Sequence, residues 1–257
     1  PFIARYRKEM TGSLDDQLLR ELSERLEYLR GLEKRKEEIL SSIESQGKLD
    51  EALAQSIANA ATLAEAEDLY RPFKPKRRTR ASIAREEGLE PLAQSIFTQE
   101  KDTLSPSELA KPFVDPEKGV NTVDDALQGA ADIIAETVAD SATLRKTLRN
   151  FLLMHGILKT ESKPGADPVY EMYAAYSEPV AKIAPHRVLA IDRGEREGAL
   201  KVSLEADLER CRKTIVRDFV KENTPCADFV RNAAFDGFSR LIFPSLEREV
   251  RSALTEK

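Results

Sequence analysis

The stretch that decides how the rest of the chain is organised is residues 68–92, which read DLYRPFKPKRRTRASIAREEGLEPL. Between positions 71 and 85 this stretch has seven basic residues and no acidic one, although the whole chain has a formal net charge of -5. These residues, called the basic segment below, are Arg71, Lys74, Lys76, Arg77, Arg78, Arg80 and Arg85. Because Lys and Arg neutralise phosphates whatever the base sequence, the segment is the candidate nucleic-acid contact of the chain.

A second interpretation of the basic segment is a solvated loop whose cations pair with acidic helices of the same chain. The sequence offers 45 Asp and Glu residues for such pairing, and charge runs are often plain solvent-exposed surface. The two interpretations predict different structures. Cations that contact nucleic acid are exposed together, whereas cations of a solvated loop are each matched by a carboxylate.

The local structure around the basic segment follows from its prolines and glycine. Pro72 and Pro75 disfavour the α conformation in the residues before them, so the first half is expected to run extended. A helix can begin near Ala81 or Ser82 and end at Gly88, which suits a left-handed C-terminal cap. Pro91 suits a first helical position, so a second helix is expected at once, giving a unit compatible with a helix-turn-helix.

The same stretch closely resembles the signature of the Tex family of bacterial transcription accessory proteins. Three further stretches resemble that family in the same order along the chain: PFIARYRKE at 1–9, HRVLAIDRGEREG at 186–198 and NAAFDGF at 232–238. The resemblance implies the helical amino-terminal region of a larger nucleic-acid-binding protein. In its complete form that protein also carries an RNase H-like domain, a helix-hairpin-helix domain and an OB-fold RNA-binding domain. Since the chain starts inside a motif and without Met, we expect it to be a fragment that lacks those domains.

Composition limits the class of protein. No apolar run approaches membrane-spanning length and no leader precedes a cleavage site, so a cytoplasmic protein is expected. Cys211 and Cys226 have neither a CxxC spacing nor a nearby His, so they predict buried packing residues and no zinc site. His155, beside the stop at Gly156, is interpreted as structural, since a protonated imidazole suits the C-terminal end of a helix.

A mainly α-helical, elongated scaffold is predicted from the 33% of charged residues, the absence of Trp and the small number of glycines. A short helix is expected over residues 1–10, and a long spine helix from an N-cap at Ser13 to Glu44. Apolar residues recur along the spine at helical spacing: Leu18, Leu22, Leu26, Leu29, Leu32, Ile39 and Ile43. This stripe predicts packing on the short helices that follow. A coiled-coil seam is the alternative, although Gly31 interrupts it.

Three further helices are predicted from their caps. Asp50 caps a helix through Asn59, Thr62 begins one that ends at Tyr70, and Ser105 opens a capping box with Pro106 at the first helical position. After a loop over 112–121, helices over 123–138 and 141–155 form a hairpin. The tail from Glu205 is expected to be helical in at least three pieces, with a kink or restart at Pro244.

The middle of the chain is expected to be less regular. Residues 159–167 predict a flexible loop or boundary, because they are polar and contain Pro164 and Gly165. Tyr170, Tyr173 and Tyr176 recur every three residues; packed aromatics are favoured over stacking on RNA bases. Four parts are thus predicted: 1–70, the spine and its packing helices; 71–160, the basic segment and helical hairpin; 161–204, a loop and β-hairpin; and 205–257, the terminal helices.

A β-hairpin is predicted over residues 188–202, where two apolar runs flank a Gly-containing turn. A strand that ends in Ile191-Asp192 also resembles the start of an RNase H-like nuclease, in which the Asp binds a metal. That chemistry needs further carboxylates from later strands, and the remaining sequence predicts helices. Asp192 is therefore interpreted as a turn residue.

No catalytic residue, metal ligand or cofactor is predicted, because no nucleophile-base pair or phosphate-binding glycine loop is present. The first functional hypothesis is a non-catalytic scaffold of a transcription accessory protein that binds nucleic acid, RNA in preference to DNA. The second is a protein-interaction scaffold that docks the missing domains of the full-length chain or the transcription machinery.

Overall fold

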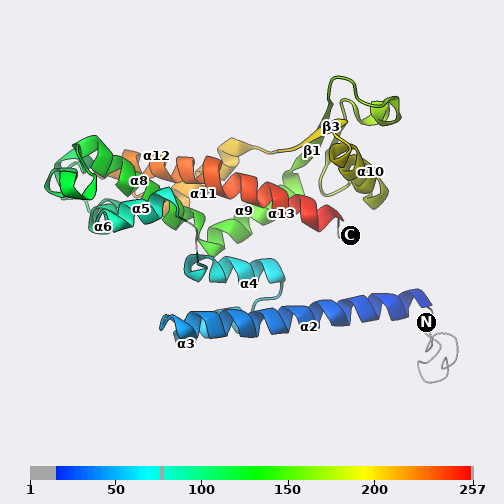
Figure 1. The fold of residues 1–257 in the computed structure, drawn as a ribbon, viewed down its shortest axis with the longest axis horizontal. Helices are drawn as coiled ribbons and strands as arrows, with labels where there is room; N and C mark the ends of the chain where they lie inside the picture. The colour runs from blue at the N-terminus through cyan, green and yellow to red at the C-terminus, as the bar shows by residue number, and fades with distance from the viewer. Residues whose placement is uncertain (1–15, 76–77, 256–257) are drawn as a thin grey trace. The chain divides into compact units, whose positions relative to one another are not determined.

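The computed structural model describes residues 16–75 and 78–255, and it is mainly α-helical with one small sheet (Figure 1). The chain forms two compact units, residues 1–74 and 75–257. The helix expected over 1–10 and the N-cap expected for the spine helix at Ser13 lie outside the described residues. No described helix is both long and apolar enough to cross a membrane. The predicted division into four parts stays a prediction.

The first unit is built on the predicted spine helix, α2 (Asp16–Ser45). Its C-terminal half packs on α3 (Glu51–Ala58) and α4 (Leu63–Tyr70), which begin at the predicted caps Asp50 and Thr62. Their shared core has seven buried residues: Leu32, Ile39, Ile43, Ile57, Ala60, Ala66 and Tyr70. The predicted packing of the spine on the following short helices is thus confirmed for this half.

The N-terminal half of α2 differs from that expectation. Leu22 is 59% exposed and Leu26 is 45% exposed, and Leu18, Tyr28 and Leu29 are also exposed. The apolar stripe therefore continues beyond the short helices, because α3 and α4 cover only the turns from Leu32 onwards.

The second unit begins with α5 (Arg80–Glu86) and α6 (Glu90–Thr98), separated by Gly88 at φ +84°. Both helices pack on α8 (Val123–Ala139), as does α7 (Pro106–Ala110), which begins at the predicted Ser105 capping box. The turn at Gly88 is confirmed, and the second helix begins at Glu90, which places Pro91 in its first turn. Two short 3-10 turns, η3 (Lys111–Phe113) and η4 (Pro116–Lys118), occupy the expected loop before α8. The helix predicted over 141–155 is α9 (Ala142–His155), and Ser141 is its N-cap.

A three-stranded antiparallel sheet follows, in the order β2-β1-β3. The central strand β1 (Ile157–Ser162) occupies the start of the segment predicted to be a loop, so that prediction was wrong for residues 159–162, whereas residues 163–167 contain no helix or strand. Thr160 is buried there and bonds the carbonyl of Tyr173, while Leu158 lies opposite Leu204. The strands β2 (Ser177–Pro179) and β3 (Leu200–Glu205) flank it.

The β-hairpin predicted over 188–202 is also wrong. Residues Pro185–Arg196 form helix α10, and only the second apolar run belongs to a strand, β3. Pro185 begins the helix, and Val188, Ile191 and Gly194 form its buried face at helical spacing. Between β1 and β2, the 3-10 turn η5 (Pro168–Tyr173) buries Tyr170 and Tyr173, which confirms the packing interpretation for these two tyrosines.

Three helices complete the unit: α11 (Leu208–Phe219), α12 (Ala227–Gly237) and α13 (Phe243–Thr255). A π-helical turn, η6 (Phe238–Ile242), joins the last two. The expected restart near Pro244 is confirmed. Proline lacks the N–H that continues an α-helical ladder, and a π turn directly before it changes the bonding register.

Candidate nucleic-acid interface

The basic segment divides between the two units, and its first residues do not run extended as expected. Arg71–Phe73 forms the 3-10 turn η2, with Pro72 in the first turn, and only Lys74 is extended. Proline fixes a φ that a 3-10 turn also requires, so the prolines favour a tight turn as readily as an extended chain.

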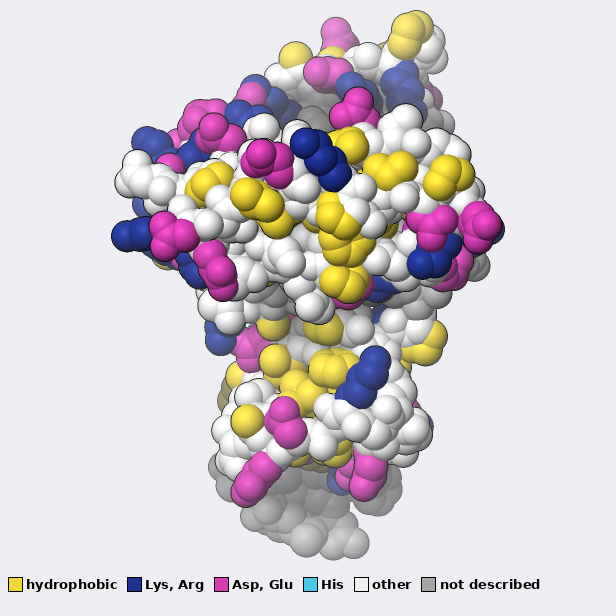
Figure 2. Space-filling model, turned by 90° about the vertical axis from the view of Figure 1, so that its left-hand side faces the viewer, with side chains coloured by type: hydrophobic (Ala, Val, Ile, Leu, Met, Phe, Trp, Pro, Cys, Tyr) yellow, Lys and Arg dark blue, Asp and Glu magenta, His cyan; other side chains and the backbone are white. Residues whose placement is uncertain are grey.

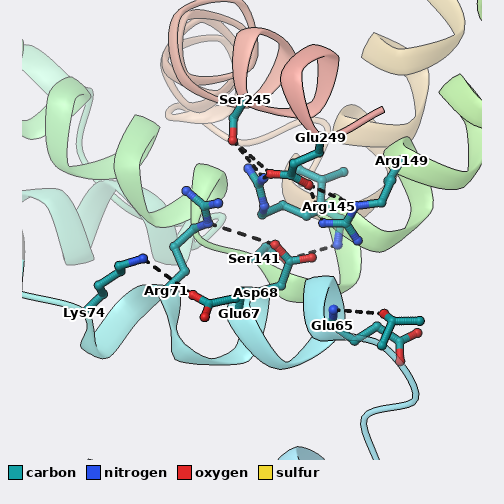
Figure 3. Close-up of polar contacts among 12 residues, drawn as sticks. Glu65, Glu67, Asp68, Arg71, Lys74, Ser141, Arg145, Arg149, Ser245 and Glu249 are labelled. Carbon is teal, nitrogen blue, oxygen red and sulfur yellow. Dashed lines mark hydrogen bonds and ion pairs between the residues drawn. The ribbon is translucent and has the colours of Figure 1, made fainter. Parts of the chain in front are cut away.

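Two cations of the basic segment, Arg71 and Lys74, lie in the first unit, and each has a carboxylate partner on α4 (Figure 3). The Nζ of Lys74 lies 3.5 Å from Glu67, and the Nε of Arg71 lies 4.0 Å from Asp68. Glu67 also accepts a hydrogen bond of 2.6 Å from Arg35. Burial raises the pKa of Glu67, but the bond from Arg35 and the nearby charges outweigh burial and lower it. These two cations therefore match the solvated-loop interpretation more closely than the phosphate-contact one.

The cations at the start of the second unit are more accessible. The side chain of Arg78 is 73% exposed, and its guanidinium is 3.9 Å from Glu86. Arg80 is exposed and has no ion-pair partner within residues 16–75 and 78–255. Acidic and basic side chains are interspersed over the face of the molecule that Figure 2 shows. Lys76 and Arg77 lie outside the described residues.

The start of α5 is fixed to α8 through a buried carboxylate, Glu136. The hydroxyl of Thr79, the N-cap of α5, donates to Glu136 at 3.2 Å, and Arg85 donates to it at 2.6 Å. Thr79 and Ser82 also close a capping box. Because Thr79 lies between Arg78 and Arg80, this bond holds the backbone that carries both cations.

Arg85 is neutralised more fully than Arg78 and Arg80. It bonds Glu90 at 2.7 Å as well as Glu136. Burial lowers the pKa of Arg85, but the hydrogen bonds to Glu136 and Glu90 outweigh burial and raise it. Arg85 thus serves to hold α5 on α8, and Arg78 and Arg80 are the described cations best placed for a phosphate.

The helix that follows α5 and the turn at Gly88 is α6, which contains no Lys or Arg. α6 reads EPLAQSIFT, and its exposed residues include Pro91, Gln94, Ser95 and Thr98. In a helix-turn-helix the second helix enters the major groove, where Arg and Lys make the commonest specific contacts. Two helices joined by a tight turn are present, but the cations lie before and within the first helix, α5, and not on the second.

Other residues singled out in the sequence have structural partners. The interpretation of Asp192 as a turn residue is wrong, because it lies on α10; its carboxylate accepts a hydrogen bond of 2.7 Å from Thr255 and lies 3.6 Å from Arg251. Cys211 and Cys226 are buried, and burial raises the pKa of the Cys211 thiol to about 11. The ring of His155 packs on Phe151 at 5.1 Å. The described residues contain no group of three or more His, Cys, Asp or Glu side chains placed to hold a metal ion.

Two features were missed in the sequence. The first is Glu136, although an acidic residue on the apolar face of a predicted helix signals a buried partner. The second is α11, whose sequence LERCRKTIVRDF has four basic residues within eight positions: Arg210, Arg212, Lys213 and Arg217. Only the apolar face of that segment was used in the prediction.

Two family models match the chain. The model described as Tex central region-like covers residues 101–257, and the Tex-like protein N-terminal domain covers residues 1–44. The basic segment lies between the two matched regions, and α11 lies within the first of them.

Curated relatives agree with these matches. Protein YdcI of Bacillus subtilis is 42% identical over the whole chain, which spans 36% of that relative. The transcriptional accessory protein Tex of Neisseria gonorrhoeae is 43% identical over 80% of the chain, and S1 RNA-binding domain-containing protein 1 of Pongo abelii is 32% identical over 99% of it. The chain spans 27% of each of these two relatives. Since the central-region model covers more than half of its residues, the chain belongs to the Tex family.

Proposed function

We propose that this chain is a non-catalytic, nucleic-acid-binding scaffold of a transcription accessory protein, with RNA as the preferred partner. Arg78 and Arg80 contact phosphates, and Lys76 and Arg77, which precede them in the sequence, extend the contact. The observation that carries the proposal is the pair of accessible cations at the start of α5, whose backbone is tied to α8 through Thr79 and Glu136.

The names of two relatives support the nucleic-acid part of the proposal. One is called a transcriptional accessory protein and another an S1 RNA-binding domain-containing protein. The absence of Lys and Arg from α6 favours phosphate contact over base reading in a major groove. A phosphate contact of this kind binds nucleic acid with little sequence preference.

The test is fluorescence anisotropy of the 257-residue chain with labelled single-stranded RNA, hairpin RNA and duplex DNA at low salt. We expect Arg78→Ala with Arg80→Ala to weaken RNA binding. The matched control is Arg193→Ala with Arg196→Ala, which removes two exposed arginines from α10 and is expected to leave affinity unchanged. Equal losses in the two variants would show that only net charge matters. No binding by the unaltered chain would contradict the proposal.

A second candidate function is a protein-interaction scaffold. It is favoured by the carboxylate partners of Arg71, Lys74 and Arg85, and by the exposed apolar stripe of α2. Under this alternative Leu22→Gln with Leu26→Gln would abolish capture of the partner protein and leave RNA binding intact. The variant Arg78→Ala with Arg80→Ala would then have no effect on RNA.

A further inference from the structure

A shallow groove between α11 and α12 is lined by basic side chains and by an aromatic ring. Its volume is about 410 Å³, and its walls are Glu209, Arg212, Lys213, Val216, Arg217 and Phe235. All six residues belong to the second unit and lie within its described part. The groove is separate from the start of α5, where the proposed phosphate contacts lie.

A guanidinium stacked on a ring forms one wall of this groove. The guanidinium carbon of Arg212 lies 5.5 Å from the centre of the Phe235 ring, within the range of a cation–π contact. Its Nη1 donates to Glu209 at 2.7 Å, which further restrains the guanidinium. Its Nε is buried and has no hydrogen-bond partner among the residues that the structure describes. The ring contact and Glu209 therefore determine how this side chain lies.

Two further cations lie on the same helix beside that stack. Lys213 is exposed and makes no ion pair within the described ranges, and the side chain of Arg217 is 69% exposed with Asp218 as its partner at 2.7 Å. Residues four apart lie on one face of a helix, separated by about 6 Å along its axis. That separation is comparable to the distance between neighbouring phosphates of an extended single strand.

We infer that this groove is a second nucleic-acid contact, specific for single strands, which rests on the proposed function and deepens it. One unpaired base lies against Arg212 and Phe235, and the flanking phosphates contact Lys213 and Arg217. Bases of single-stranded RNA stack on aromatic rings and on flat guanidinium groups. Bases inside a duplex are already stacked and cannot enter a groove, so the groove discriminates between the two forms.

An acidic peptide would also be attracted to these cations, but the stack argues for a base. A carboxylate can bind to any of the cations and gains nothing from the Phe235 ring, whereas a base gains from a flat stacking surface. Charge and shape together therefore favour a nucleotide. The two classes of ligand differ in how they respond to Phe235→Leu, which keeps every cation and removes the ring.

The experiment compares a labelled uridine-rich single strand with an abasic strand of the same length and phosphate number, each titrated with the 257-residue chain. We expect Arg212→Lys and Phe235→Leu each to weaken binding of the base-bearing strand by roughly 5- to 100-fold. Neither should change binding of the abasic strand. Lys213→Ala with Arg217→Ala should reduce the salt slope for both strands by about 1.4, because two contacts are removed. Lys163→Ala with Lys201→Ala, at the sheet, is the matched control.

Circular dichroism establishes that each variant is folded. Arg212→Lys is the decisive variant, because it changes the side-chain volume little. Photo-crosslinking of 4-thiouridine RNA, mapped by mass spectrometry, is expected to label α11 or α12. Crosslinks only to the basic segment, with Arg212→Lys binding normally, would overturn the groove and leave the proposed function standing. Equal weakening of base-bearing and abasic strands by Arg212→Lys would also overturn the base contact. No binding of any strand by the unaltered chain would contradict both proposals.

Discussion

At the scale of single residues, one carboxylate organises the start of α5. Glu136 is only 7% exposed, and it accepts hydrogen bonds from both Thr79 and Arg85. Burying a carboxylate is costly unless it is paired, so Thr79 and Arg85 stabilise Glu136 and are held by it in turn. Arg78 and Arg80 flank Thr79, so their position depends on this buried group.

We therefore expect Glu136→Gln to lower the free energy of unfolding by about 1.5–3 kcal/mol, the usual value of hydrogen bonds to a charged group. Urea denaturation followed by circular dichroism measures it. Glu86→Gln is the control, because Glu86 is exposed and lies 3.9 Å from Arg78; its change should stay within about 0.5 kcal/mol. Similar effects of the two substitutions would contradict the role of Glu136.

A second carboxylate, Glu249 on α13, links that helix to α9 (Figure 3). It accepts hydrogen bonds from Arg145 and, at 2.8 Å, from Arg149. Burial raises the pKa of Glu249, but the two arginines outweigh burial and hold the pKa below its ordinary value of 4.5. Because the folded pKa is the lower one, the stabilisation is present above pH 4.5 and is lost as the pH falls through the folded pKa.

The comparison of wild type with Glu249→Gln tests this assignment. At neutral pH the variant should be less stable, and the difference in unfolding free energy should shrink as the pH is lowered below about 4.5. Urea denaturation at a series of pH values gives the difference. A gap that stays constant down to pH 2.5 would show that the arginines do not act on the charge of Glu249.

At the scale of elements, close packing of α5 and α6 on α8 depends on Gly129. A Cβ added there would lie 2.3 Å from Leu89 Cδ1 and 3.1 Å from the Cβ of Ala84. The helix–turn–helix unit therefore approaches α8 more closely than any larger residue allows. Gly31 in α2 offers the contrast, since nothing lies within 4 Å of the position that its Cβ would take.

Gly129→Ala should lower the free energy of unfolding by about 1–3 kcal/mol, because it overpacks a closed contact. Gly31→Ala should raise it by about 0.5–1 kcal/mol, because Ala is the better helix former in an open position. Chemical denaturation of both variants checks the pair. Destabilisation by Gly31→Ala would mean that the spine helix is covered at that point.

The elements that the sequence predicted correctly are those specified by local signals. Asp50, Thr62 and Ser105 cap the helices that they were expected to cap, and Gly88 ends α5 as predicted. The strand β1 could not be predicted in this way. Its six residues bury few apolar side chains, and its partners lie about 40 positions along the chain in β3. The prediction for the segment that forms α10 was wrong because a short apolar run fits a strand or a helix equally well.

The candidate site was predictable in part. The seven cations were found from the sequence, but which of them are matched by carboxylates depends on contacts across the fold. Arg85 illustrates this, since Glu136 lies 51 positions away along the chain. The basic residues of α11 are visible in the sequence, but nothing local indicates that Phe235 of α12 lies against them.

At the scale of the whole molecule, the chain has more acidic than basic residues. It nevertheless carries two accessible basic surfaces, at the start of α5 and on α11. An excess of acidic charge repels nucleic acid at long range, so binding requires cations gathered locally. The central claim is that the accessible cations around Arg78 and Arg80 are such a gathering and contact phosphates directly.

The most direct test is the salt dependence of binding to single-stranded RNA, with log affinity plotted against log salt concentration. Each phosphate contact on a single strand contributes a slope of about -0.7, so Arg78→Ala with Arg80→Ala should flatten the line by about 1.4. The charge-matched variant Arg193→Ala with Arg196→Ala should keep the original slope. An unchanged slope in the first variant, with the protein folded, would show that these arginines do not contact phosphate.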